Sequence, residues 1–527
     1  MLTIGLYGDA DPLGQHRSHD HGVAVMENGE LIFSCELERF TGIKHDGRLN
    51  QYAEQLLEPW LNSKEKIRWV LVNSFMSDQF TSENGLLQIE AKDKLFVEQV
   101  IIKVNDTHSI LTHEMAHIGT CLPFYGNFKP NSLLVHIDGG ASNSSASAWY
   151  FDGREIQHLD HSWHSKLKVA VNNFNANPLA AKILNVNIDD HLAMPGKLMG
   201  YAGFGKYSKS LHQSLVKNNW YIENAELVDI TGGMGADIAC CMQRELEEQV
   251  LSYIRKYQSQ TGASVLYYSG GAALNIHANV RIERELKFDI VCIPPAPSDC
   301  GLALGAAAFL EWLDGKQIKI HSAYLNSTVS KKSTVETMTG LIDGVSLVTD
   351  VKQVAEFIAA GEVVAVFAGD AEIGPRALGH RSLLIRPDSI KRRKHLSEVM
   401  KQREWYRPVA PIMLEKIAES ALLEYLPNSN LSRFMLGAWT VAKEWQHYFS
   451  GCLHADNTVR AQVIDKTDPE INHIYQLLML LHKQYKIQGV INTSFNSRGM
   501  PIVGTFDQAI AQAKIIGAKY LWCPSLS

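Results

Sequence analysis

A pattern of three short strands opens the chain and recurs further along it. In each copy an apolar strand is followed by two strands that an Asn-Gly or Asp-Gly pair joins, as is typical of a β-hairpin. The first copy comprises Leu2–Tyr7, Gly22–Met26 and Glu30–Cys35, and the second comprises Leu133–Asp138, Ser145–Tyr150 and Arg154–His158. Helical segments with apolar residues at 3.6-residue spacing lie among them, including Gln51–Trp60 and Ala239–Tyr257. The pattern predicts a mixed α/β fold with an internal duplication.

The length of the chain requires more than one domain. A single hydrophobic core rarely grows beyond about 250–300 residues, and the sequence has 527. Apolar periodicity is lost in the Ser/Thr/Lys-rich segment Leu325–Asp350. We therefore place the boundary between a first domain at residues 1–340 and a second at residues 341–527. The helices predicted in the second domain are Val351–Ala360, Ile390–Met400 and Asp507–Ile516, and the strands are Val363–Ala368 and one ending at Val490–Asn492.

Charge and composition limit the class of partner. The formal net charge is -6, which gives no support for nucleic acid or an anionic membrane as the main partner. No apolar run approaches the roughly 20 residues of a membrane span, and the opening MLTIGLYGD lacks the pattern of a signal peptide. Eight scattered cysteines form no CxxC pair, as is typical of reduced thiols. We expect a cytoplasmic protein that acts on a small molecule, and a homodimer is left open.

A metal site is predicted in the first half. His113 and His117 are four residues apart, which places both imidazoles on one helical face as ligands for a divalent metal. With Glu114 the segment also matches the HExxH signature of zinc proteases, and two histidines that merely share a helix face are a third interpretation. Asp138 ends the following strand, and Asp299 precedes a Gly/Ala-rich helix start suited to phosphate. Two histidines and two aspartates suit Fe²⁺, Mn²⁺ or Zn²⁺, so the metal stays open.

An anion site is predicted in the second half, in the segments Glu372–Ser382 and Lys401–Arg407. Arg376 and Arg381 offer planar forks for phosphate or carboxylate. Aromatic residues and prolines surround the cations of the second segment, which is unlike a solvated helix face. Further along the chain, Asn492, Ser494 and Asn496 form a row of polar side chains that fits an acyl phosphate better than a nucleotide. Arg460 is the remaining candidate.

With these motifs in place, the chain resembles the O-carbamoyltransferases that modify antibiotics and nodulation factors. The resemblance runs along nearly the whole chain, and GPRALG together with NTSFN is specific to the family. The matching motifs are His19-Asp20, Glu38-Arg-Phe with Lys44-His45, His113 with His117, Asp138-Gly139, Gly196-Lys-Leu-Met-Gly200, Gly270-Gly271 with Asn275, Asp299, Gly374-Pro-Arg-Ala-Leu-Gly379, Lys401 with Arg407, and Asn492-Thr-Ser-Phe-Asn496.

The resemblance implies a fold and a reaction. The first domain would be a duplicated actin-like (ASKHA, Kae1-like) ATPase-fold domain, and the second would be a YrdC-like α/β domain. The second domain would make carbamoyl adenylate from carbamoyl phosphate and Mg-ATP, with loss of phosphate and pyrophosphate. The first would transfer the carbamoyl group to a hydroxyl of a small natural-product acceptor. Its divalent metal would be Fe²⁺, as is frequent in such folds, with Mn²⁺ or Zn²⁺ as alternatives.

The resemblance also implies roles for single residues. The metal ligands would be His113, His117, Asp138 and Asp299. Contacts to nucleotide or carbamoyl adenylate would come from Lys44, Gly139, Gly200, Gly270, Gly271 and Asn275. Carbamoyl phosphate would be bound by Arg376, Lys401, Arg407, Arg460, Ser494 and Asn496. His19 is the candidate base on the acceptor side, oriented by Asp20, and Asp237 is a candidate for holding the acceptor.

Two other classes of protein stay open, and the acceptor is not fixed. A tRNA threonylcarbamoyladenosine-type transferase would share the metal helix, but a basic surface for tRNA would be expected. A non-catalytic actin-like assembly protein would have no need of an acyl-phosphate site. The chain departs from the family pattern at His21-Gly22, where a pair of small residues is usual, and in an insertion at Ala10–Ser18. Both departures lie near the expected acceptor site.

Overall fold

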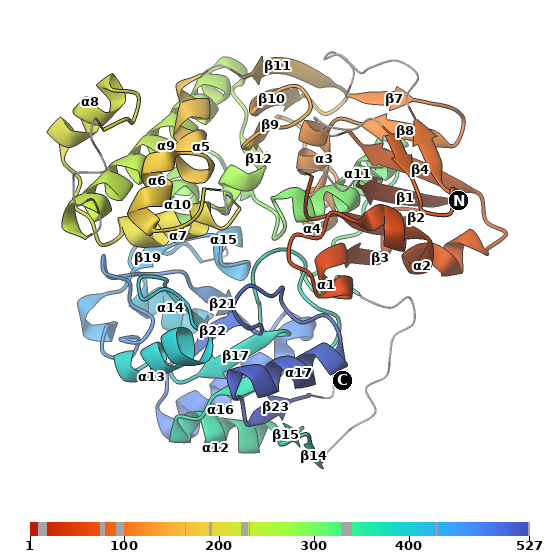
Figure 1. Ribbon diagram of the computed structural model, residues 1–527. Helices are drawn as coiled ribbons and strands as arrows, with labels where there is room; N and C mark the ends of the chain where they lie inside the picture. Colours follow the sequence, from red (N-terminus) through yellow and green to blue (C-terminus); the bar gives the residue numbers. More distant parts are fainter. Residues whose placement is uncertain are drawn as a thin grey trace.

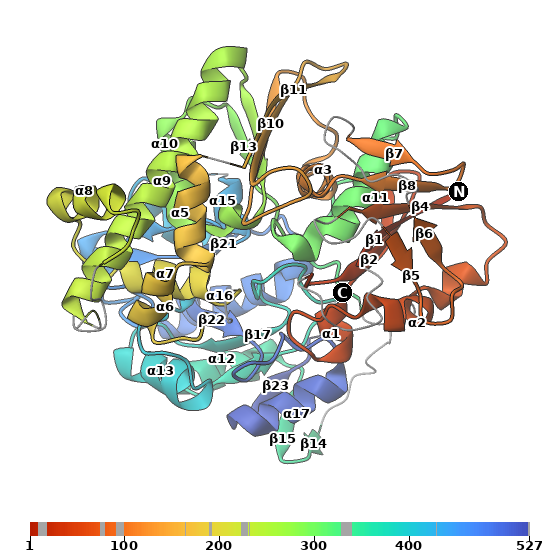
Figure 2. The same ribbon diagram turned by 45° about the horizontal axis from the view of Figure 1, so that its top comes forward.

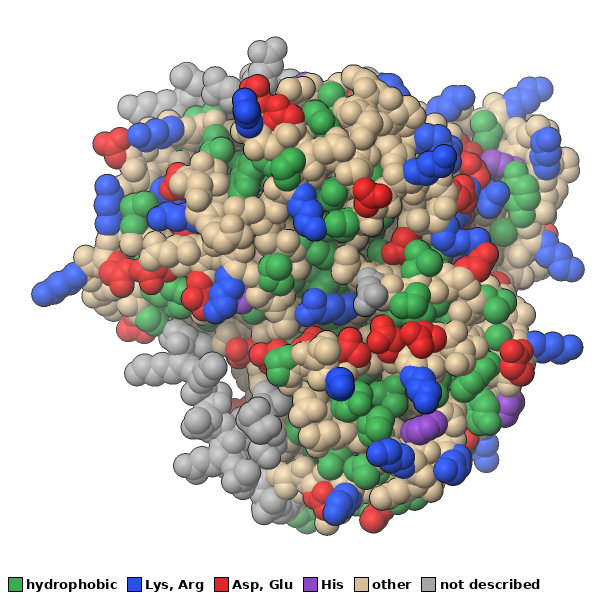
Figure 3. Space-filling model, turned by 180° about the vertical axis from the view of Figure 1, so that it is seen from behind, with side chains coloured by type: hydrophobic (Ala, Val, Ile, Leu, Met, Phe, Trp, Pro, Cys, Tyr) green, Lys and Arg blue, Asp and Glu red, His purple; other side chains and the backbone are tan. Residues whose placement is uncertain are grey.

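The structure is a computed structural model in which three large sheets form two parts of the chain (Figure 1). It describes residues 1–8, 18–73, 79–90, 100–163, 165–188, 192–222, 230, 232–327, 340–427 and 429–524. We call residues 1–327 the N-terminal part, which carries two sheets, and residues 340–524 the C-terminal part, which carries one. The two parts lie against each other in both ribbon views (Figures 1 and 2). Basic and acidic side chains are interspersed on the face seen from behind (Figure 3).

The first sheet combines an antiparallel meander with parallel strands. Its order is β3-β2-β1-β4-β8-β7. The strands are β1 (Leu2–Tyr7), β2 (Gly22–Glu27), β3 (Glu30–Glu36), β4 (Ile67–Val72), β7 (Ile101–Lys103) and β8 (His108–Leu111). β1 to β3 pair antiparallel, whereas β4 and β8 continue parallel to β1. A separate hairpin of β5 (Gln79–Thr81) and β6 (Gln88–Glu90) completes these strands.

The second sheet repeats the arrangement of the first. Its order is β11-β10-β9-β12-β13, with β9 to β11 antiparallel and β12 and β13 parallel to β9. The strands are β9 (Ser132–Ile137), β10 (Ala146–Phe151), β11 (Ile156–Ser162), β12 (Val265–Ser269) and β13 (Ile290–Cys292). Three antiparallel strands followed by two parallel ones are thus built twice. The predicted duplication is confirmed, and the strand order is that of the actin-like fold.

The helices of the N-terminal part cover both sheets. A layer of α5 to α10 packs on the second sheet, where α9 contacts α5, α7 and α10 (Figure 1). None of the helices in the described part of the chain combines the length and the apolar character needed to span a membrane. The helices are α1 (Leu37–Thr41), α2 (Leu49–Leu61), α3 (His113–Gly119), α4 (Leu122–Tyr125), α5 (Lys166–Asn175), α6 (Pro178–Leu184), α7 (Met194–Ala202), α8 (Lys209–Lys217), α9 (Gly233–Thr261), η1 (Gly271–Leu274), α10 (Ile276–Glu285), η2 (Asp299–Gly301) and α11 (Leu302–Leu313).

Helices α3 and α11 lie in close contact near the middle of the N-terminal part. The sequence LALGAAAFLEWL of α11 is rich in small residues, so the two backbones approach closely. A Cβ atom on Gly305 would lie 2.0 Å from the carbonyl oxygen of Ala116, and one on Gly119 would lie 2.2 Å from that of Gly305. This contact holds α3, which carries the predicted metal ligands His113 and His117, against the helix that follows Asp299.

The C-terminal part is one mixed sheet with helices packed on it. Its order is β14-β15-β23-β16-β17-β22-β18-β21. Its strands are β14 (Gly340–Ile342), β15 (Val345–Val348), β16 (Val364–Val366), β17 (Ser382–Ile385), β18 (Ala410–Leu414), β21 (Gln462–Ile464), β22 (Val490–Ser494) and β23 (Tyr520–Trp522). Two further strands, β19 (Trp439–Thr440) and β20 (Thr458–Val459), pair with each other in a separate small sheet. The helices are α12 (Val351–Ala360), α13 (Ile390–Lys394), η3 (His395–Met400), α14 (Glu415–Ala421), α15 (Asn430–Arg433), η4 (Lys443–Trp445), η5 (Pro469–Ile471), α16 (Asn472–Tyr485) and α17 (Phe506–Ile516).

The elements predicted in this half are present, with one change of type and one shift of bounds: the strand predicted to end at Val490–Asn492 is β22, which begins at Val490 and ends at Ser494. The predicted helix Ile390–Met400 begins as α-helix and continues from His395 as π-helix. Residues 328–339 and Ala10 to Arg17 lie outside the described residues, so the domain boundary and the role of the insertion stay predictions.

A buried ion pair of the N-terminal part forms hydrogen bonds with the C-terminal part. Glu36 at the end of β3 accepts a hydrogen bond from the Gly374 N–H, and Arg39 of α1 donates to the Gly374 carbonyl oxygen at 2.7 Å. Arg39 also donates to Glu36 at 3.0 Å, and both side chains are buried. Gly374 has φ +90°, and a Cβ atom there would lie 2.4 Å from the carbonyl oxygen of Pro295. The segment that carries Arg376 is therefore fixed by residues of the N-terminal part.

The packing of α11 on α3 gives a test of the fold. We expect Gly305→Ala to lower the free energy of unfolding by about 1–3 kcal/mol, because the added methyl group overlaps the α3 backbone. Denaturant unfolding of the purified protein measures the change. Gly196→Ala in α7 is the matched control, since its Cβ would meet nothing within 4 Å and an alanine favours the helix. Equal destabilisation by both substitutions would contradict the close packing described above.

Candidate metal centre and anion site

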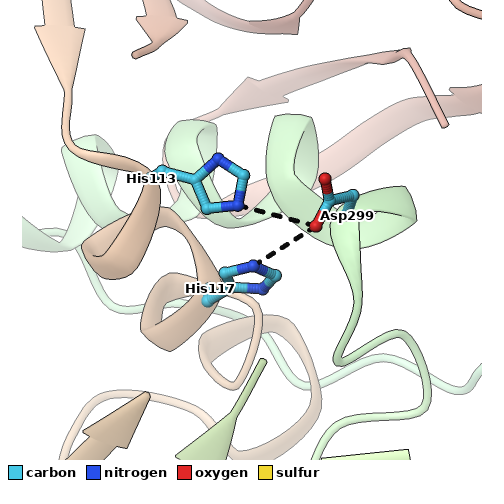
Figure 4. Close-up of side chains that lie close together, drawn as sticks. All are labelled: His113, His117 and Asp299. Atoms are coloured by element: carbon cyan, nitrogen blue, oxygen red, sulfur yellow. Dashed lines mark ion pairs between the residues drawn. The ribbon is translucent and has the colours of Figure 1, made fainter. Parts of the chain in front are cut away.

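Two histidines and one aspartate converge between α3 and η2 (Figure 4). The Nε2 atoms of His113 and His117 each lie 3.5 Å from the same oxygen, Oδ1 of Asp299. The other oxygen of Asp299 accepts a hydrogen bond of 2.8 Å from the Tyr7 hydroxyl. Burial would raise the pKa of Asp299, but the two histidines outweigh it and hold that pKa well below its usual value. The helical spacing of the histidines thus brings them together as the sequence predicted.

Asp138 approaches the same site from the end of β9. Its oxygens accept the backbone N–H groups of Gly139 and Gly271, and Oδ2 lies 3.7 Å from His117 Nε2. Gly270 has φ +102°, and a Cβ atom on it would lie 2.3 Å from the carbonyl oxygen of Ile137. The glycine turns after β9 and β12 therefore meet around one carboxylate, and their backbones set its position.

Two residues of this site were missed by the sequence analysis. Tyr7 at the end of β1 binds Asp299, and His136 of β9 stacks on His117 with ring centroids 5.1 Å apart. Ligand atoms of His117, His136 and Asp138 lie within 4.8 Å of one another, as do those of His113, His117 and Asp299. The signal for His136 was its place two residues before Asp138, which directly follows the end of β9, so that both are expected on one side of the chain.

The donor set fits a divalent cation. In the described part of the chain, neither ring nitrogen of His113, His117 or His136 has a hydrogen-bond partner, although all three rings are buried. A buried polar atom without a partner costs about 1–3 kcal/mol, so such a cluster is expected to have a ligand. Imidazoles with carboxylates are donors for Fe²⁺, Mn²⁺ or Zn²⁺. The three histidines with Asp138 and Asp299 are thus able to hold such an ion.

The geometry argues against a zinc protease. Glu114, which would be the base in that reading, is buried and points to a backbone turn. Its Oε1 atom accepts the N–H groups of Asn143 and Ser144 at 2.5 and 2.9 Å. A carboxylate committed to these amides is not placed to activate a metal-bound water.

The predicted acceptor-side residues form a cluster around Asp20. His19 Nδ1 lies 2.9 Å from Oδ2 of Asp20, and His45 Nδ1 lies 2.7 Å from its Oδ1. Burial would lower the pKa of His19, but the hydrogen bond to Asp20 and the carboxylates of Asp299 and Asp138 raise it to about 9. His45 was only part of a motif in the sequence analysis. Lys44 beside it is exposed.

Three other predicted site residues form contacts with other parts of the protein. The Asn275 amide caps α10 and exchanges hydrogen bonds with Gln243. Oδ1 of Asp237 accepts the backbone N–H of Lys206 at 2.6 Å. A Cβ atom on Gly200 would lie 3.1 Å from Pro408 of the C-terminal part, so this glycine lies where the two parts meet. Their assignment to nucleotide or acceptor stays a prediction.

In the C-terminal part the predicted anion site is a cluster of basic side chains, of which Lys401 is buried and the arginines are partly buried. Arg376, Lys401, Arg403, Arg407 and Arg460 form this cationic cluster. Burial and then repulsion from Arg407 and Arg403 lower the pKa of Arg376 to about 10. Burial and neighbouring arginines also lower the pKa values of Lys401, Arg403 and Arg460. Glu404 is the acidic residue paired with the cluster, 3.6 Å from Arg407. Such an excess of positive charge favours a bound anion.

Lys401 joins the cluster to the end of β22. Its ammonium group donates to the carbonyl oxygen of Ser494, to the carbonyl oxygen of Asn496 at 2.9 Å and to Asn496 Oδ1 at 2.7 Å. The Ser494 hydroxyl donates to the same Oδ1 at 2.7 Å. Three of the predicted carbamoyl-phosphate residues are therefore in direct contact. Asn492 instead donates to the carbonyl oxygen of Ala377 and fixes the GPRALG segment.

Two arginines have contacts that differ from those predicted from the sequence. Arg403 was not among the predicted ligands, although it lies in the cationic cluster and donates to Thr493 at 3.2 Å. Arg381 was interpreted as a phosphate fork, and that interpretation is wrong. Its guanidinium donates to the carbonyl oxygens of Ala368, Gly369 and His380 and lies over the ring of Phe367. These backbone carbonyl oxygens occupy the guanidinium fork of Arg381.

Two family models match the chain, one in each of its parts. Residues 89–308 match the family described as Carbamoyltransferase N-terminus, and residues 355–526 match the one described as Carbamoyltransferase C-terminus. The chain belongs to the carbamoyltransferase family. It is a transferase enzyme, and carbamoyl transfer is its class of reaction.

Relatives of this carbamoyltransferase match along nearly all of the chain. Nodulation protein NolNO of Sinorhizobium fredii is 25% identical, covering 97% of this chain and 80% of its own. Nodulation protein U of Azorhizobium caulinodans is 24% identical, covering 97% and 98%.

The solved structures resemble the carbamoyltransferase in fold alone. A full-length HypF in the phosphate- and nucleotide-bound form has a TM-score of 0.35 and 11% identity, covering 60% of this chain and 56% of its own. A ROK hexokinase from Thermus thermophilus has a TM-score of 0.31 and 12% identity, covering 60% and 100%. A Sua5 from P. abyssi has a TM-score of 0.24 and 16% identity, covering 35% and 49%.

The presence of Arg403 in the cationic cluster leads to a binding prediction. We expect Arg403→Ala to raise the dissociation constant for inorganic phosphate by about 10–100-fold, because a hydrogen bond to a charged group contributes about 1.5–3 kcal/mol. Isothermal titration calorimetry measures the constant. Arg244→Ala, a half-exposed arginine of α9, is the control with the same change of charge. Equal weakening by both substitutions would mean that only net charge matters.

Proposed function

We propose that this enzyme is an ATP-dependent O-carbamoyltransferase that works through carbamoyl adenylate. In the C-terminal part, water cleaves carbamoyl phosphate to carbamate and phosphate. A carbamate oxygen then attacks the α-phosphorus of ATP and displaces pyrophosphate, which leaves carbamoyl adenylate. In the N-terminal part, an acceptor hydroxyl attacks the carbamoyl carbon, AMP departs, and the hydroxyl proton passes to a base.

The observation that carries this proposal is the cationic cluster. Arg376, Arg403, Arg407 and Arg460 are forked donors that suit phosphate oxygens, and Lys401 ties them to the polar end of β22. Ser494 and Asn496 offer hydroxyl and amide groups beside that ammonium group. Phosphates with a small amide-like group attached match this combination. We assign carbamoyl phosphate and the phosphates of Mg-ATP to it.

The second step is assigned to the site between α3 and η2. His113, His117, Asp138 and Asp299 would hold the divalent ion, for which we propose Fe²⁺ ahead of Mn²⁺ or Zn²⁺. When bound, the ion would neutralise charge on the nucleotide phosphate as AMP leaves. The backbone amides of Gly139 and Gly271 orient Asp138, and the Tyr7 hydroxyl orients Asp299.

His19 is proposed as the base that takes the acceptor proton, with Asp20 as the residue that orients it. Its pKa of about 9 keeps the ring protonated near neutral pH as long as no cation neutralises the carboxylates of Asp299 and Asp138. A cation on Asp299 and Asp138 would remove their share of this upward shift, while the hydrogen bond to Asp20 would remain and keep the ring oriented as it accepts the proton. His45, on the other oxygen of Asp20, completes this group.

The acceptor is proposed to be a hydroxyl group of a small natural product. Relatives that match nearly the whole chain are named for nodulation, and the family at large acts on carbamoyl groups. Antibiotic precursors, sugars and nucleosides are the classes to screen.

The division of labour between the two sites gives a paired test. Pyrophosphate release is followed with ATP, Mg²⁺ and Fe²⁺, with and without carbamoyl phosphate. We expect release to depend on carbamoyl phosphate, to fall at least about 100-fold in Arg376→Ala, and to persist in His113→Ala. Metal content should fall in His113→Ala and stay unchanged in Arg376→Ala, so each variant is the control for the other. If both folded variants lose both properties, the assignment of one step to each site is wrong.

A further inference from the structure

We propose that His136 is a further ligand of the metal centre, so that three imidazoles rather than two face the bound cation. The inference rests on the metal centre assigned above and adds a donor on its Asp138 side. It concerns a residue that neither the HxxxH spacing nor the family motifs single out.

Strand geometry points the His136 side chain at the centre. Successive residues of a strand face opposite sides, so His136 shares its face with Leu134 and Asp138. Leu134 packs in the core that includes Met115 and Ile118 of α3, whereas Val135 and Ile137 pack in the core on the other face. His136 is thus on the face of β9 that meets α3. Its ring stacks on His117 with an interplanar angle of 23°.

The imidazole of His136 is fully buried and has no hydrogen-bond partner for either nitrogen in the described part of the chain. Its register neighbours on β10 and β12 are Ser147 and Ser269, whose hydroxyls are committed elsewhere. Ser147 Oγ bonds with Ser144 and with His161 at 2.8 Å. Ser269 Oγ bonds with Thr120 and the carbonyl oxygen of Pro297. The hydroxyls of Ser147 and Ser269 therefore do not bind the ring nitrogens of His136, which stay available to a ligand.

The donors around His136 are close enough to share one ion. Ligand atoms of His117, His136 and Asp138 lie within 4.8 Å of one another. His117 also belongs to the group with His113 and Asp299, so its ring joins the two groups. A bound cation draws such donors inward and satisfies the buried nitrogens. Three imidazoles also make the site richer in nitrogen, which favours Fe²⁺ or Zn²⁺ over Mg²⁺.

The competing explanation is that His136 is a packing residue whose ring stacks on His117. Stacking needs an aromatic ring but no nitrogen, so phenylalanine would keep it and remove the donor. His136→Phe therefore separates the two explanations, and His136→Leu supplies a second variant without a donor should the larger ring disturb folding.

The test counts the imidazoles on the metal. Full-length protein is stripped of metal and reloaded with Mn²⁺, and pulsed EPR with ¹⁵N-labelled histidine counts coordinated imidazole nitrogens. We expect three in the wild type and two in His136→Phe or His136→Leu, with the Mn²⁺ dissociation constant raised at least about tenfold. His158→Phe is the control, because His158 is exposed on β11, and it should keep three nitrogens and the wild-type constant.

The outcomes separate this inference from the metal centre itself. If the wild type and the folded His136 variants give the same nitrogen count and the same Mn²⁺ affinity, His136 is a packing residue and the inference is overturned. If the wild type binds none of Mn²⁺, Fe²⁺ or Zn²⁺, the metal centre assigned above fails, whatever the variants do.

Discussion

The hydrogen bonds of Glu36 and Arg39 to Gly374 join the part that carries the candidate metal centre to the segment that carries Arg376 of the anion site. Two opposite charges are buried together, and both bind the same glycine: Glu36 accepts a hydrogen bond from its N–H and Arg39 donates one to its carbonyl oxygen. A buried pair of this kind contributes more to a unique arrangement than to net stability, since desolvation offsets much of the attraction. Here it fixes where the Arg376 segment begins relative to the N-terminal part.

The two candidate sites suit ligands of opposite charge, a cation at the first and an anion at the second. The centre at His117 gathers carboxylates and imidazoles whose ring nitrogens have no hydrogen-bond partner among the described residues, whereas the cationic cluster gathers basic side chains whose pKa values burial and mutual repulsion lower. Neither arrangement is favourable without a ligand, because polar atoms in both are left unsatisfied. Local conflicts of this type concentrate at functional sites, where a ligand supplies the missing partner. The remainder of the core is conventional, with apolar strands between apolar helix faces.

Much of this arrangement could be predicted from local sequence. The Asn28-Gly29 and Asp152-Gly153 turns fixed both meanders, and helical spacing fixed His113 and His117. His136 was hidden because β9 is buried on both faces and shows no polar alternation. Arg381 and Arg403 are the same residue type, and only tertiary contacts show that one binds carbonyl groups and the other joins the cluster. Tyr7 reaches Asp299 across nearly 300 positions, a distance that no local pattern spans.

The composition of the cationic cluster also bears on turnover. Its forked side chains recognise phosphate oxygens, which carbamoyl phosphate, phosphate and pyrophosphate all carry. For the proposed reaction, the attraction that draws the substrate in also retains what the first step releases. Product escape then becomes a natural candidate for the slowest event of the cycle. An enzyme with this design would work best where other enzymes keep free phosphate and pyrophosphate scarce.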